Sequence, residues 1–147
     1  MTALKTPLGA LETVTQESTG DIFLIGTYQG LPLAIETRSP KQPLEGVDFA
    51  FIRDKIIQFP DIKNRTEQFF KTMLADKSSA SALGWTKGDI TGSLLSYPEF
   101  SFSAGKDTWS IIYRESIFPI AQPYGILVNY RGDCIIGFED ISDAEEL

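Results

Sequence analysis

Apolar and polar residues alternate near both ends of the chain, and this period of two is typical of β-strands with one buried face. Near the N-terminus the pattern predicts three strands, at 11–18, 22–28 and 31–37. Gly20 and Gly30 mark the tight turns between them, because glycine readily adopts the positive φ that such turns need. A second group of about four strands is predicted later in the chain, at 94–104, 109–114, 126–131 and 134–138.

Between the two groups of strands the period changes to that of a helix. Apolar residues recur at helical spacing at Phe49, Ile52, Ile56 and Phe59. We expect Asp48 to cap this helix, Pro60 to stop it and Asp61 to cap a second one. The apolar stripe of the second helix consists of Ile62, Phe69, Phe70, Met73 and Leu74. A capping-box pattern at 142–145 predicts a short C-terminal helix.

Grouped strands and grouped helices, rather than regular alternation, favour an α+β fold. Turns of hairpin length favour antiparallel pairing. The sequence therefore predicts one α+β domain spanning residues 1–147, with three strands, two helices and then about four strands. We expect a mostly antiparallel sheet of about six to seven strands, with the two short central helices packed on one face and the short C-terminal helix after it.

Composition excludes several kinds of chemistry. The 147 residues include no histidine and one cysteine, which excludes Ser-His and Cys-His catalysis, His-ligated metals and a disulfide framework. Cys134 enters the apolar run Ile135–Ile136 beside a carboxylate, which predicts a buried, structural thiol. We expect no metal, no cofactor and no enzymatic activity. An enzyme that uses paired carboxylates stays open as a weaker alternative.

The net charge of −7 is unevenly distributed along the chain. Residues 88–147 carry ten acidic and three basic side chains. The net charges of residues 1–46 and 47–87 are −2 and +2, so they cancel each other. Phosphates repel an acidic surface, so we expect no direct nucleic-acid partner. Such a surface can attract a basic protein or simply keep the domain soluble. No signal peptide and no apolar run of membrane-spanning length is present, which predicts a cytoplasmic protein with no membrane partner.

Two sets of residues in the second group of strands are candidates for binding a partner. The acidic set lies near the C-terminus and consists of Glu139, Asp140, Asp143, Glu145 and Glu146. The aromatic set consists of Trp109, Tyr113 and Tyr130. Aromatic rings on the solvent face of a sheet make good interface anchors, whereas rings on the other face belong to the core. The alternative for the acidic set is a solvated surface without a partner.

Several segments occur in an order and at a spacing that suggest a relationship to known proteins. The first is the hairpin at 12–28, and the second is a helix pair that contains Phe49-Ala50-Phe51-Ile52, Phe59-Pro60-Asp61-Ile62 and Glu67-Gln68-Phe69-Phe70. A series of strands follows, with Trp109-Ser110-Ile111-Ile112-Tyr113 and Pro123-Tyr124-Gly125-Ile126-Leu127-Val128. The last segment is Gly137-Phe138-Glu139-Asp140. This arrangement resembles small standalone bacterial domains, several of which are immunity proteins. The resemblance implies a cytoplasmic inhibitor without catalytic residues, whose partner is a basic toxin domain. An accessory or scaffold domain with a different protein partner is the second hypothesis.

Overall fold

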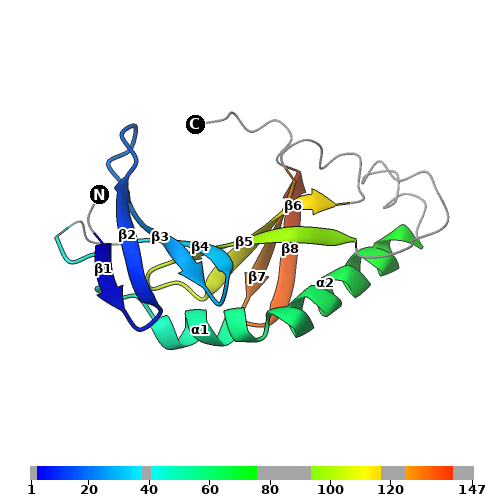
Figure 1. Cartoon of the computed structure of the whole chain (residues 1–147). Helices are drawn as coiled ribbons and strands as arrows, with labels where there is room; N and C mark the ends of the chain where they lie inside the picture. The colour runs from blue at the N-terminus through cyan, green and yellow to red at the C-terminus, as the bar shows by residue number, and fades with distance from the viewer. Residues whose placement is uncertain (1–2, 38–40, 76–93, 117–124, 141–147) are drawn as a thin grey trace.

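The computed structural model describes residues 3–37, 41–75, 94–116 and 125–140 (Figure 1). Eight strands form one sheet, in which they lie in chain order from β1 to β8. The strands are β1 (Ala3–Thr6), β2 (Gly9–Thr15), β3 (Ile22–Tyr28), β4 (Leu31–Glu36), β5 (Leu95–Ser103), β6 (Thr108–Ser116), β7 (Ile126–Arg131) and β8 (Cys134–Asp140). Two helices, α1 (Phe49–Ile57) and α2 (Phe59–Leu74), lie between β4 and β5 in the sequence.

The predicted sheet of about six to seven strands with two short helices is wrong, because the sheet has eight strands and α2 is 16 residues long. The expectation that most neighbouring strands pair antiparallel is confirmed. The sheet is mixed, because β4 and β5 run parallel while the other neighbours are antiparallel. The strand that the pattern did not predict is β1, which is only four residues long and alternates between exposed and half-buried positions. The helical segment between β4 and β5 allows the chain to return and start β5 in the same direction. The predicted C-terminal helix at 142–145 lies outside the described residues.

The two helices meet almost without a break. As predicted, Asp48 caps α1, and its Oδ1 accepts a hydrogen bond from Phe51 N at 3.0 Å. Pro60 does not separate the helices but occupies the first turn of α2, which Gln58 precedes as its cap. Proline is tolerated there because the backbone N–H that it lacks has no partner in the first turn. Neither described helix is long and apolar enough to cross a membrane.

Aromatic rings fill the space between the helices and one face of the sheet. Phe59 of α2 meets Phe100 edge-on, with ring centroids 5.4 Å apart. On the same face the ring of Trp109 stacks on that of Tyr130, with ring centroids 4.5 Å apart. The buried core around these rings consists of Leu8, Leu11, Leu24, Leu33, Ile35, Ile52, Ile56, Ile62, Phe70, Leu94, Leu95, Phe100, Phe102, Trp109, Ile111, Tyr113, Ile126, Val128 and Tyr130. The core thus draws on β2 to β7 and on both helices, although they are far apart in sequence.

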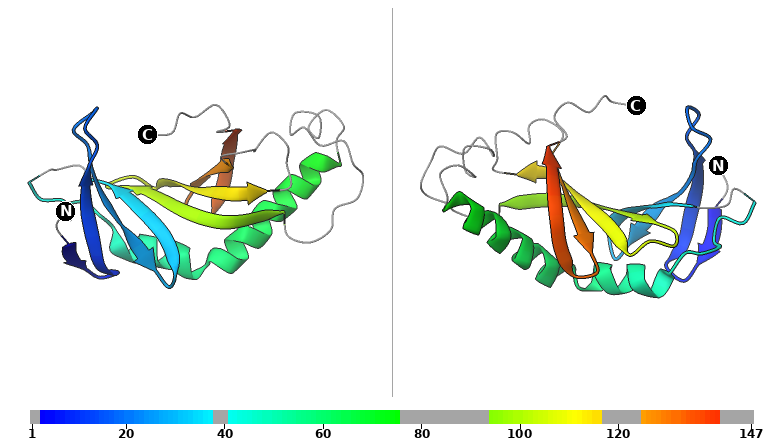
Figure 2. Two further views of the ribbon diagram at one scale, coloured as in Figure 1. Left: turned by 45° about the horizontal axis from the view of Figure 1, so that its top comes forward. Right: turned by 180° about the vertical axis from the view of Figure 1, so that it is seen from behind.

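Both ends of the sheet bend away from the helices. In Figures 1 and 2 the β2–β3 turn and the C-terminal end of β8 point to the side opposite α1 and α2, whereas the β7–β8 turn lies beside α1. The sheet is therefore a trough whose outside is covered by the helices. We call the inside of the trough, which neither described helix covers, the open face.

The burial of α2 leads to a prediction about stability. Phe70 is 0% exposed, whereas Phe69 is only partly buried and packs against the edge of the core. Phe70→Ala should therefore lower the free energy of unfolding by about 3–5 kcal/mol, and Phe69→Ala by clearly less. Urea unfolding of the two variants measures the difference. Equal losses, or an unchanged midpoint for Phe70→Ala, would show that the core-facing side of α2 is assigned incorrectly.

Candidate functional site

The open face is built from the residues that alternate with the core residues along the strands. Leu24, Ile35 and Phe102 are buried under the helices, so the positions next to them in β3, β4 and β5 lie on the open face. One row of paired positions crosses seven strands, through Glu12, Ile25, Ala34, Ser101, Ser110, Asn129 and Gly137. A second row contains Val14, Phe23, Glu36 and Ser103, and a third contains Glu99, Ile112, Leu127 and Glu139.

Large apolar side chains are exposed at two places on this face. Ile25 of β3 is 41% exposed, and its half-buried neighbours Val14 and Phe23 extend the apolar surface. Ile136 of β8 is 52% exposed. The pairing of β7 with β8 shifts register here, from Asn129↔Gly137 to Tyr130↔Ile135, so Ile136 is the extra residue of a β-bulge, which re-aims its side chain. A contiguous apolar patch, such as that of Ile25 with Val14 and Phe23, is a feature of interaction sites.

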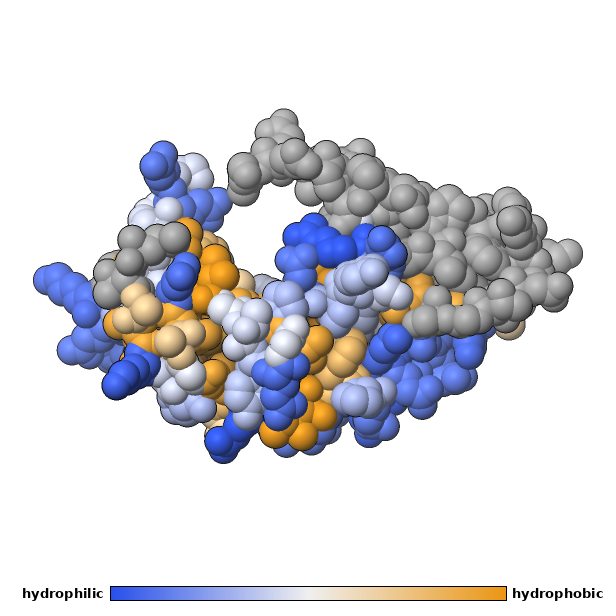
Figure 3. Space-filling model, viewed as in Figure 1, coloured by the Kyte–Doolittle hydropathy of each residue, from blue (hydrophilic) through white to orange (hydrophobic). Residues whose placement is uncertain are grey.

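A polar hollow lies between these apolar regions. Its volume is about 370 Å³, and its described lining includes Ser101, Ser103, Lys106, Thr108, Ser110, Asn129 and Ile136. Ser110 Oγ donates a hydrogen bond to Asn129 Oδ1 at 2.6 Å, so the amide donors of Asn129 are directed to other partners. Figure 3 shows the molecule hollowed between the β2–β3 hairpin and the strands at the other end of the sheet. The hollow offers hydroxyl and amide groups for hydrogen bonds at an interface.

Among the described residues, the open face carries carboxylates that no ion pair neutralises, and the ammonium of Lys106, which lines the polar hollow, is not in an ion pair either. Arg114 is paired with Glu99 through two hydrogen bonds, and the bond to Glu99 raises the pKa of Arg114. Glu12, Glu36 and Glu139 are exposed and form no ion pair with another described residue. An acidic, partly apolar face complements a basic, partly apolar partner.

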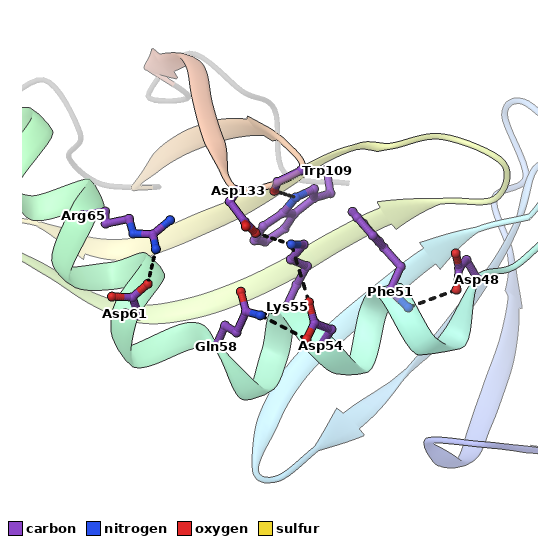
Figure 4. Close-up of polar contacts among 10 residues, drawn as sticks. Asp48, Phe51, Asp54, Lys55, Gln58, Asp61, Arg65, Trp109 and Asp133 are labelled. Atoms are coloured by element: carbon purple, nitrogen blue, oxygen red, sulfur yellow. Dashed lines mark hydrogen bonds and ion pairs between the residues drawn. The ribbon is translucent and has the colours of Figure 1, made fainter.

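An ion pair between a buried lysine and a half-exposed aspartate holds the β7–β8 turn in place (Figure 4). The side chain of Lys55 on α1 is only 7% exposed, and its ammonium pairs with Asp133 in this turn. The hydrogen bond from Lys55 lowers the pKa of Asp133. Trp109 Nε1 donates to the carbonyl of Gly132 in the same turn at 2.9 Å. These two contacts fix the hairpin that carries Ile136 and Glu139 to the open face.

A chain of buried hydroxyl groups links α2 to the centre of the sheet. Thr66 Oγ1 donates to the carbonyl of Ile62 at 2.7 Å and lies 2.8 Å from the hydroxyl of Tyr130. Because Thr66 has one proton to donate, Tyr130 donates to Thr66, and Tyr113 donates in turn to Tyr130 across 3.2 Å. Burial raises the pKa of Tyr113 far above its usual range and that of Tyr130 to about 12. Both tyrosines are therefore neutral and structural at physiological pH.

The structure separates the residues that the sequence put forward as a site. Trp109, Tyr113 and Tyr130 are 3%, 0% and 1% exposed, so their rings lie in the core and do not reach the surface as anchors. Glu139 is exposed on the open face, and Asp140 is the last residue of β8. The other acidic candidates, Asp143, Glu145 and Glu146, lie outside the described residues. Among the described residues there is no group of three or more side chains that could hold a metal ion.

The prediction that Cys134 is buried is wrong. Cys134 is exposed, because it begins β8, which is the edge strand of the sheet formed by the described residues. Sequence reasoning also missed Ile25 and Ile136 as surface residues. The alternation of Ile25 with Leu24 along the sequence indicates that the two residues lie on opposite faces of the sheet. The bulge that exposes Ile136 has no such signal in the local sequence.

The ion pair of Lys55 predicts a specific pH dependence of stability. Asp133→Asn leaves the buried ammonium of Lys55 without its main partner, which should lower the free energy of unfolding at pH 7 by about 1–3 kcal/mol. Because the pKa of Asp133 is lowered in the folded protein, its contribution is complete above the unfolded pKa of about 3.9 and is lost as the pH falls through the folded pKa. Urea unfolding at pH 7 and in acid should show this loss in the wild type only.

A matched control comes from an exposed ion pair. Asp61 pairs with Arg65 on the surface of α2, where both side chains are more than half exposed. Asp61→Asn should change stability by less than about 1 kcal/mol. If Asp133→Asn were no more destabilising than Asp61→Asn, the ion pair would not hold the turn.

The position of Cys134 predicts its reactivity. A water-soluble thiol reagent should label the native protein about as fast as the urea-unfolded chain, because the side chain is exposed. Cys134→Ser should leave the unfolding midpoint nearly unchanged. Labelling that requires unfolding would restore the buried thiol that the sequence predicted.

Comparison with known proteins gives no family for this chain. No family model, no curated protein and no solved structure matches it. The resemblance to bacterial immunity-type domains therefore rests on the order and spacing of sequence segments alone.

Proposed function

We propose that this domain is a non-enzymatic binding protein that docks a basic protein partner on its open face. The observation that carries the proposal is the exposure of Ile25 and Ile136 on the face of the sheet that neither described helix covers. These residues add nothing to the core, yet they give the face two apolar anchors. Apolar anchors surrounded by polar groups are the usual design of a protein interface.

The size of the open face supports a specific interaction. Eight strands about 4.8 Å apart and about 20 Å long give a face on the order of 700 Å². A standard protein–protein interface buries about 800 Å² on each partner. The open face can therefore supply nearly all of one side of such an interface without a contribution from the helices.

The charge of the face supports a basic partner. Glu12, Glu36 and Glu139 lie around the apolar residues, where they would steer a cationic surface during encounter. Such an effect acts mainly on the association rate and weakens as salt shortens the Debye length below about 10 Å. The partner class that we favour is a bacterial toxin in the cytoplasm, such as a nuclease, whose phosphate-binding surface carboxylates would mask.

The first test uses matched isoleucine variants. Ile25→Lys and Ile136→Lys change the open face, whereas Ile57→Lys places the same substitution on α1, where Ile57 is 52% exposed. A protein captured from the source cells by the wild type should bind the two open-face variants at least about tenfold more weakly and the Ile57→Lys variant unchanged. Glu36→Lys should slow association, with a smaller dependence on salt. Equal binding of all variants would remove the open face from the interface.

A second test separates an inhibitor from a scaffold. The captured protein is expressed alone and then together with the domain, and cell growth is followed. Growth arrest that the wild type relieves and Ile25→Lys does not would support neutralisation of a toxin. A captured protein that is harmless when expressed alone would overturn the toxin inhibitor and leave an accessory or scaffold role for the same surface.

A further inference from the structure

A second cavity lies on the helix side of the sheet and shares Ser103 and Lys106 with the lining of the polar hollow. Its volume is about 360 Å³, which is within the range of small-molecule sites. It is lined by the start of α1, the loop before it and the turn between β5 and β6, and it opens to solvent. The apolar part of its lining consists of Ile35, Val47, Phe51, Ile52, Phe102 and Ala104. Phe51 and Phe102 meet edge-on, with ring centroids 6.4 Å apart.

Backbone hydrogen bonds between distant segments hold the walls of this cavity. Ala104 N donates to the carbonyl of Glu36 at 2.9 Å, and Gly105 N donates to the carbonyl of Gly46 at 3.0 Å. Gly46 and Gly105 both have a positive φ, near 75°, which lets the two turns approach each other without strain. The cavity is therefore preformed, and a ligand that enters it does not have to order its walls.

One charged group at the cavity has no partner of opposite sign among the described residues. Asp48 is engaged as the cap of α1, where the positive end of the helix also compensates it. Asp107 forms an ion pair with Arg131, whose Nε lies 3.9 Å from Asp107 Oδ1. Lys106, by contrast, forms no ion pair with another described residue. The charge at the cavity that remains to be neutralised is thus the ammonium of Lys106.

We propose that this cavity binds a small amphipathic carboxylate. Its apolar body would lie against Phe51 and Phe102, and its carboxylate would pair with the ammonium of Lys106. An apolar pocket with an ammonium at its rim that forms no ion pair with another described residue selects for this combination, because the ring contacts supply the affinity and the positive charge sets the orientation. The inference does not depend on the docking of a protein on the open face.

Octanoate, below its micelle concentration, is a suitable probe. Titration followed by amide NMR of the full chain should shift the signals of residues 46–52 and 102–107. Octanol, which has the same chain and no charge, and octylammonium, which has the opposite charge, should each bind at least about tenfold more weakly. Equal affinity for the three compounds, or no shift with octanoate, would overturn the proposal.

Two variants locate the site. Lys106→Gln should weaken the binding of octanoate about tenfold. Lys71→Gln, which removes the same charge from the exposed side of α2, should leave octanoate binding unchanged. Val47→Phe, which fills the cavity from its lining, should abolish binding with the unfolding midpoint retained. If Lys106→Gln and Lys71→Gln bind octanoate equally, the carboxylate does not reach Lys106 and the proposal fails.

Discussion

The parallel pairing of β4 with β5 is the constraint on which the rest of the structure depends. Two parallel neighbours cannot be joined by a hairpin, so the chain must cross back over the sheet before it starts β5. It does so through α1 and α2, and both helices therefore lie against the same face. The antiparallel strands on either side of the central pair need only hairpin turns. An eight-stranded sheet with a helix-covered face and an open face follows directly.

The helices must also be held at a defined position along this face. Apolar packing is not directional, so polar contacts fix this position. Lys55 ties α1 to the β7–β8 turn, and Thr66 ties α2 to the tyrosine pair of β6 and β7. Glu67 adds a third attachment, because its Oε2 accepts hydrogen bonds from Leu94 N and Leu95 N at 2.7 and 3.2 Å. No buried side-chain polar atom of the described residues lacks a hydrogen-bond partner, so these attachments do not leave a desolvation cost behind.

Sequence patterns within a short segment correctly predicted the features that depend only on that segment. The helical spacing of Ile52 and Ile56 and the cap at Asp48 are properties of a short segment, and the structure confirms them. The parallel pairing of β4 with β5 depends on residues more than sixty positions apart, as in Leu33↔Phe100, and has no local signal. The same holds for the bulge at Ile136. Trp109 and Tyr113 are a different case: the sequence put them forward as candidates for binding a partner, although their alternation with Ser110 is a local signal for the core side of β6, where the structure places them.

The separation of the two faces has a consequence for how stability and binding are distributed over the chain. The residues that hold the domain together, such as Phe70 and Tyr113, lie on the helix side and are fully buried. Ile25 and Ile136 lie on the other side and keep much of their apolar surface in water, although burying such a side chain would contribute about 1.5–3 kcal/mol. Folding does not use that free energy. It becomes available only when another molecule covers the open face, which is why substitutions there should weaken binding while the fold is retained.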